Sequence, residues 1–109
     1  MAEPRWYKGC THAHTTESDG DVSPAKVAEW YRDHGYDWVV MSDHNTVTRM
    51  PDVAKLDGLL TITGEEVTAH LEDDPVAVYV NAFRLPNTVD PIISDGVLDT
   101  LQDNINAII

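Results

Sequence analysis

Three short apolar stretches of this chain are each followed by side chains that can bind a metal ion. His12 and His14 follow the first stretch, and Asp19 lies five residues beyond His14. His44 follows the second stretch, and Glu66 follows the third. Imidazole and carboxylate ligands together suit zinc, manganese or iron. Potential ligands after three successive strand-like segments therefore predict a metal site.

Hydrophobic periodicity predicts alternating strands and helices. Ser23 and Pro24 form a typical helix start, and Gly35 is a typical helix stop. A continuous apolar run, such as the one around residues 38–41, is typical of a parallel strand buried on both faces. The expected strands are 5–10, 36–42, 59–63 and 76–83, and the expected helices are 24–34, 51–56 and 96–109.

This alternation indicates an α/β fold with mainly parallel strands. Ligands at the carboxyl ends of successive strands fit the arrangement of α/β barrels, in which the βα loops carry the chemistry. Four strands cannot close such a barrel, and the apolar side of the helix at 96–109 needs a further element to cover it. We therefore expect residues 1–109 to be the N-terminal part of a larger domain.

Composition limits the possible partners. The chain has 109 residues, enough for one domain, and a formal net charge of −12. This charge argues against general binding to a nucleic-acid backbone, which requires clustered lysine and arginine. There is no apolar run long enough to span a membrane and no signal peptide at the start. The compartment stays open between the cytoplasm and export with a leader removed.

The order of the motifs is more specific than any one of them. His-x-His at residues 12–14, Ser-Asp-Gly at 18–20, Asp-His-Asn-Thr at 43–46 and Gly-x-Glu at 64–66 together resemble the PHP (polymerase and histidinol phosphatase) family. The resemblance implies a distorted seven-stranded, TIM-like β/α barrel that holds two or three zinc, manganese or iron ions. The chain would then be a single PHP-like domain, truncated at its C-terminus.

The resemblance also assigns roles to individual residues. It makes His12 and His14 ligands of a first metal, Asp19 and His44 ligands of another, and Glu66 the bridging carboxylate. Family members usually have a further histidine before a Val-Asn-Ala-like stretch, where this chain has Tyr79. His70 is a possible substitute for that ligand, and an exposed polar role for it is an equal alternative.

Two further choices follow from the residues themselves. Adjacent side chains of a strand face opposite ways, so only one of Glu65 and Glu66 can point into the site, and the Gly-x-Glu pattern selects Glu66. Asp43 is expected either to orient an imidazole or to cap the loop that follows it. His34, at the end of a predicted helix, is expected to act as a C-terminal cap.

The implied activity is metal-dependent hydrolysis of a small-molecule phosphate ester by a metal-activated water. One alternative is a metal-binding or scaffolding module without catalysis. Another is a metal hydrolase that acts on a different class of ester. Apolar surface left uncovered by a partial barrel also predicts self-association.

Overall fold

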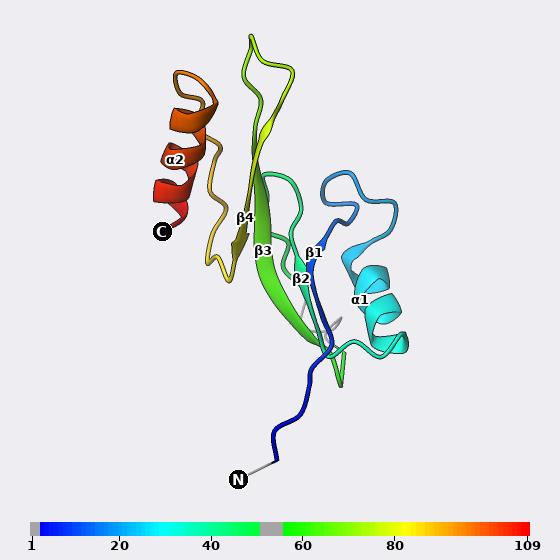
Figure 1. The fold of residues 1–109 in the computed structure, drawn as a ribbon. Coiled ribbons are helices and arrows are strands. Elements are labelled where there is room, and N and C mark those ends of the chain that lie inside the picture. Colours follow the sequence, from blue (N-terminus) through cyan, green and yellow to red (C-terminus); the bar gives the residue numbers. More distant parts are fainter. Residues whose placement is uncertain (1–2, 51–55) are drawn as a thin grey trace.

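The computed structural model describes residues 3–50 and 56–109. These residues form a curled four-stranded sheet with two helices beside it (Figure 1). In chain order the elements are β1 (Gly9–Ala13), α1 (Pro24–Asp33), β2 (Trp38–Met41), β3 (Leu60–Ala69), β4 (Val78–Phe83) and α2 (Val97–Ile108).

The sheet is mainly parallel, as the sequence predicts. Its strand order is β1-β2-β3-β4, and β1, β2 and β3 run parallel to one another. The last strand, β4, pairs antiparallel with β3 through a hairpin. The carboxyl ends of β1 and β2 therefore lie at one end of the sheet, where His14 and His44 follow them, while His12 lies within β1 and Glu66 within β3.

The largest differences from the predicted strand boundaries are in β1 and β3. β1 begins at Gly9 rather than residue 5 and continues through His12. The predicted strand at 59–63 was too short, because β3 continues to Ala69 and pairs with β4 along its second half. The polar pair Glu65 and Glu66 interrupts the apolar pattern without ending the strand. The predicted helix at 51–56 lies almost entirely outside the described residues.

The main core lies between α1 and the outer face of β1 and β2. Ser23 caps α1 by accepting a hydrogen bond from the backbone amide of Lys26, and Pro24 occupies the first turn. Val27 and Ala28 are buried in a cluster with residues of β1, of β2 and of the turn before β3, namely Ala13, Val39, Met41 and Leu59.

The second helix is attached through polar side chains. Thr100 and Asn104 are its buried residues. The Asn104 amide accepts from the backbone nitrogen of Ile92 at 2.9 Å and donates to its carbonyl at 2.8 Å. By contrast, Leu98 is 79% exposed, so part of the apolar side of this helix is uncovered. In the described part of the chain, neither helix combines the length and hydrophobicity that crossing a membrane requires.

The concave face of the sheet is also open. Trp38 pairs with Leu60 and Val40 with Ile62, so these four side chains share one face of the sheet. They line a shallow hollow of about 290 Å³, and Leu60 is 62% exposed. The described residues measure 48 × 34 × 22 Å, which reflects this open, elongated arrangement.

We expect Gly64→Ala to destabilise the fold by about 1–3 kcal/mol. A Cβ atom at this position of β3 would lie 2.6 Å from Val40 Cγ1 and 2.8 Å from the carbonyl oxygen of Ala82. Urea denaturation measures the loss. Leu60→Ala on the same strand is the control, since its exposed side chain predicts a much smaller change. A Gly64→Ala chain as stable as the wild type would contradict this packing.

We also expect concentration-dependent self-association, because contiguous apolar surface promotes it. Sedimentation velocity should show it, and Leu60→Lys in the concave hollow should weaken it. Gln102→Lys on the exposed side of α2 makes the same change in charge and should not. A chain that is monomeric at all concentrations would refute the expectation.

Candidate metal centre

An irregularity in β1 sets the direction of the first two histidines. Between Cys10 and Ala13 the chain advances by three residues, while the paired residues of β2 advance by two. Such a β-bulge re-aims the side chains around it. Ala13 remains buried in the core beneath α1, whereas His12 and His14 reach towards Glu66.

His44 is held beside Glu66 by an extension of the pairing between β2 and β3. The backbone nitrogen of Glu66 donates to the carbonyl of Asp43 at 3.0 Å, and the nitrogen of Asn45 donates to the carbonyl of Glu66 at 3.2 Å. Asn45 adopts a left-handed φ of 52°, and its side-chain amide pairs with both backbone polar groups of Thr68. The turn that presents His44 is therefore tied to β3 on both sides.

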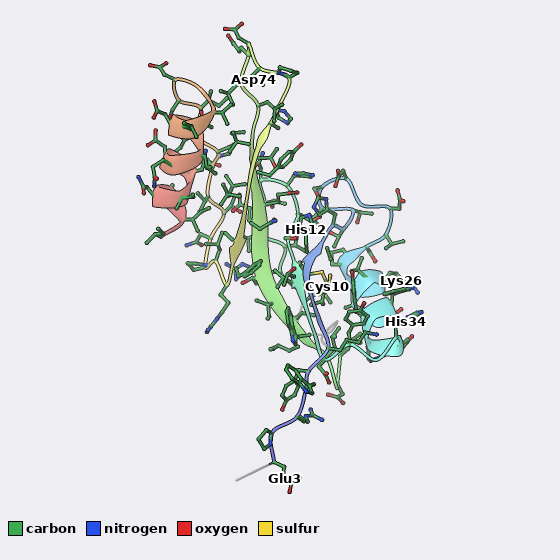
Figure 2. All side chains as sticks on the ribbon, in the orientation of Figure 1. Glu3, Cys10, His12, Lys26, His34 and Asp74 are labelled. Atoms are coloured by element: carbon green, nitrogen blue, oxygen red, sulfur yellow. The ribbon has the colours of Figure 1, made fainter. Side chains whose placement is uncertain are left out.

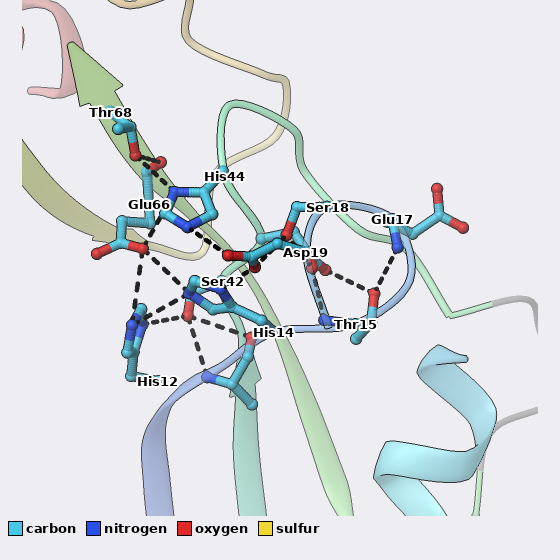
Figure 3. Close-up of polar contacts among 12 residues, drawn as sticks. His12, His14, Thr15, Glu17, Ser18, Asp19, Ser42, His44, Glu66 and Thr68 are labelled. Carbon is cyan, nitrogen blue, oxygen red and sulfur yellow. Dashed lines mark hydrogen bonds and ion pairs between the residues drawn. The ribbon is translucent and has the colours of Figure 1, made fainter. Parts of the chain in front are cut away.

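Three imidazoles surround one carboxylate oxygen (Figure 3). The Oε2 atom of Glu66 lies 3.0 Å from His14 Nε2, 3.7 Å from His12 Nε2 and 3.3 Å from His44 Nδ1. The Nε2 atoms of His12 and His14 are 3.2 Å apart. The side chain of Glu66 is nearly buried, so water screens this cluster weakly.

The first three donors match the geometry of a bound ion. His12, His14 and Glu66 form a group whose ligand atoms are close enough together to share one metal ion. Their triangle has edges of 3.0, 3.2 and 3.7 Å. A tetrahedral ion with bonds of about 2.0–2.1 Å separates its ligands by about 3.3–3.4 Å. The triangle therefore fits one face of a tetrahedral site.

Hydroxyl groups behind two of the imidazoles orient the rings. The Thr68 hydroxyl donates to the Glu66 carbonyl at 3.0 Å, so it accepts a hydrogen bond from His44 Nδ1 at 2.7 Å. Ser42 Oγ lies 2.7 Å from His12 Nδ1 and accepts from the backbone nitrogen of Ala13. Contacts of this kind fix the ring orientation and leave Nε2 free as a ligand.

Asp19 contacts two of the histidines. Its Oδ1 atom accepts from His14 Nδ1 at 2.6 Å, and its Oδ2 atom lies 3.4 Å from His44 Nε2. The hydrogen bond from His14 lowers the pKa of Asp19. These three residues form a second group that could hold a metal ion, and His14 belongs to both groups. When His14 Nε2 serves the first group, its Nδ1–H remains directed at Asp19.

All five predicted ligands thus lie together at one end of the sheet. His14 contacts Asp19 through Nδ1, and its Nε2 atom faces the carboxylate of Glu66. Imidazole nitrogens and a carboxylate oxygen gathered at one point form a donor set that fits a divalent metal ion.

The structure separates the two adjacent glutamates. Glu65 points to the opposite face of β3, where its Oε2 atom accepts from the backbone nitrogen of Val89 at 2.8 Å. Its Oε1 atom has no hydrogen-bond partner among the described residues. Burial raises the pKa of Glu65, and Asp90 adds to the rise. Of the pair, only Glu66 contacts the histidines.

The other two histidines and Tyr79 lie outside these two groups. His70 is exposed and belongs to neither potential metal group of the described residues. Tyr79 is 53% exposed, and its ring centroid lies 6.2 Å from that of His44. His34 ends α1, where its Nδ1 atom lies 2.7 Å from the carbonyl oxygen of Trp30, as expected of a C-terminal cap (Figure 2).

Of the two roles expected for Asp43, the structure shows the cap on the loop that follows it, because its Oδ2 atom accepts from the Thr48 hydroxyl in that loop. Asp43 contacts no imidazole directly among the described residues; the Ser42 and Thr68 hydroxyls do, and neither was predicted. Burial opposes the charge of Asp43, but hydrogen bonds from Thr48, Thr15 and Ser18 outweigh this cost and lower its pKa. The signal for Thr68 was its place two residues after Glu66, on the same face of a strand that the prediction ended too early.

We expect zinc to raise the melting temperature, because an ion that binds only the folded chain stabilises it. At 100 times the dissociation constant the gain is about 2.7 kcal/mol, or roughly 10 °C or more for a domain of this size. His12→Ala and His14→Ala should remove most of the shift, and the control His34→Ala should keep it. Equal shifts in all three variants would contradict the assignment.

Comparisons of the chain with models of known protein families, with curated proteins and with solved structures find no match in any of the three. The function must therefore be inferred from the chain's own motifs and from the contacts among its residues.

Proposed function

We propose that this chain belongs to a metal-dependent phosphoesterase of the PHP type that hydrolyses a small-molecule phosphate ester. The proposal rests on one observation above all. Two imidazole nitrogens and one carboxylate oxygen, from strands far apart in the sequence, form a triangle with the dimensions of a metal site. The resemblance of the surrounding motifs to the PHP family supports the class of reaction.

Different residues would hold the two ions. His12, His14 and Glu66 would hold the first ion, while Asp19 and His44 would contribute to another. Glu66 would bridge the two ions, and the position of its Oε2 atom, within 3.7 Å of a nitrogen of each of the three histidines, supports this role. Bound divalent ions supply an activated water nucleophile at neutral pH and stabilise negative charge on the phosphate oxygens.

The chemistry of the donors favours particular metals. Imidazole with carboxylate suits zinc, manganese and iron better than calcium or magnesium alone. Carboxylates at the centre also repel a phosphate ester when no ion is bound, and the chain's net charge of −12 adds to that repulsion. Substrate binding is therefore expected to require the metal.

We propose further that the curled sheet is part of a distorted seven-stranded barrel. Three observations support this interpretation. The three parallel strands place their carboxyl ends together, the sheet is curled (Figure 1), and its apolar concave face is open to solvent. The missing ligands of a complete PHP site would come from the additional strands.

A non-catalytic metal-binding module is the second candidate. The position of Tyr79 favours it, because an exposed phenol stands near His44 where the family usually has a further histidine. A site with fewer ligands can bind an ion without activating water efficiently.

We expect this chain to hydrolyse 4-nitrophenyl phosphate only slowly, since the ligands of further strands are absent, and only when zinc or manganese is added; EDTA should abolish the reaction. Glu66→Gln should lower the rate by at least about 100-fold, since it removes a charged ligand from the centre. Glu65→Gln, its neighbour on the opposite face, is the matched control and should keep most of the activity. Release of 4-nitrophenolate measures the rate.

Two companion substrates separate the alternatives. Hydrolysis of 4-nitrophenyl acetate without hydrolysis of the phosphate monoester or diester would indicate a different class of ester. Zinc binding without turnover on any of the substrates would identify the non-catalytic module and refute the phosphoesterase.

A further inference from the structure

Asp43 is a fully buried carboxylate that no part of the proposed chemistry uses. Its Oδ1 atom accepts from the backbone nitrogen of Thr15 at 2.6 Å and from the Ser18 hydroxyl at 2.7 Å. Its Oδ2 atom accepts from the hydroxyls of Thr15 at 2.8 Å and Thr48 at 2.5 Å. All four donors are neutral, so hydrogen bonds, rather than a neighbouring cation, stabilise the negative charge of Asp43.

The partners of Asp43 flank the metal-binding residues. Thr15 directly follows His14, and Ser18 directly precedes Asp19. Ser18 has one hydroxyl hydrogen, which the 2.7 Å contact with Asp43 takes in preference to a 3.4 Å contact with Asp19. The hydroxyl therefore fixes the backbone beside Asp19 rather than the carboxylate itself.

The loop from residue 15 to residue 20 closes tightly on this anchor. The carbonyl of Thr15 accepts from the backbone nitrogens of both Ser18 and Gly20. A Cβ atom at Gly20 would lie 2.7 Å from the backbone of His14 and of Thr15, so the loop packs against its own start. Asp43 is fixed in turn, because its carbonyl accepts from the backbone nitrogen of Glu66 in β3.

We infer that Asp43 is a positioning residue that holds Asp19 against His14 and so sets the orientation of that imidazole. It connects a carboxylate on an exposed loop to the strand that presents Glu66. The Asp19 side chain is 65% exposed, so the position of its 2.6 Å contact with His14 depends mainly on the loop backbone. The inference rests on the metal centre of the proposed function.

Zinc affinity, measured by isothermal titration of the full chain with zinc alone, tests this role. Asp43→Asn removes the charge and replaces one acceptor oxygen with an amide that cannot accept. Loss of a residue that supports a ligand typically costs about 10- to 100-fold in metal affinity, and we expect a loss in that range. Asp21→Asn, an exposed position just past the same loop with the same change in charge, should leave the affinity unchanged.

A double-mutant cycle distinguishes positioning from general stabilisation. If Asp43 acts through Asp19, Asp43→Asn should cost less than about threefold in zinc affinity when Asp19→Ala is already present. Ser18→Ala, a milder change in the loop, should show the same dependence and takes the place of Asp43→Asn if that variant does not fold. Equal losses with and without Asp19, or wild-type affinity in both variants, would overturn the inference.

The result also separates this inference from the proposed function. A wild-type chain that binds zinc but hydrolyses no phosphate ester refutes only the phosphoesterase. A wild-type chain that does not bind zinc overturns the metal centre and the role of Asp43 together.

Discussion

The arrangement of this end of the molecule depends on the electrostatics around one atom, Oε2 of Glu66. Nitrogen atoms of three imidazoles approach it within 3.7 Å, and a second carboxylate lies behind two of those rings. The two carboxylates, Glu66 and Asp19, repel each other when no cation lies between them. The fold holds them through backbone features that act before any ion is present: the bulge in β1, the tied turn around Asn45 and the loop anchored on Asp43.

Much of the site could be predicted because its residues lie in short motifs. The His-x-His spacing brings His12 and His14 near each other, and the parallel pairing of β2 with β3, continued past β2, brings His44 beside Glu66. The alternation of a strand was enough to separate Glu65 from Glu66, and the structure shows that separation.

The features that escaped prediction depend on pairing between distant segments. The true length of β3 follows from its hairpin with β4, which the polar residues in mid-strand conceal. The bulge in β1 exists only relative to β2. Three of the four hydrogen bonds to the Asp43 carboxylate come from residues 25 or more positions away, and only the bond from Thr48 lies within the following loop that local spacing could indicate.

The open apolar face and the polar cluster affect each other. The hollow lined by Val40 and Ile62 lies on the same face of the sheet as Glu66. Along β3, Ile62 lies four residues before Glu66 on that face, and Gly64 lies two residues before it. Any element that covers this face would also remove water from the base of the cluster. Charges in such an environment interact more strongly than in water, so covering the hollow would tighten the hold of these residues on a cation.

The adjacent glutamates of β3 have a consequence for how the strand finds its alignment. If β3 slipped by one residue, Glu65 would replace Glu66 in the cluster, and a carboxylate would still face the histidines. Metal binding alone therefore selects poorly between the two alignments. Gly64 does select, because a slip in either direction would place Thr63 or Glu65 where a Cβ atom meets Val40 at 2.6 Å. Gly64, which has no side chain, therefore favours the alignment in which Glu66 rather than Glu65 faces the histidines.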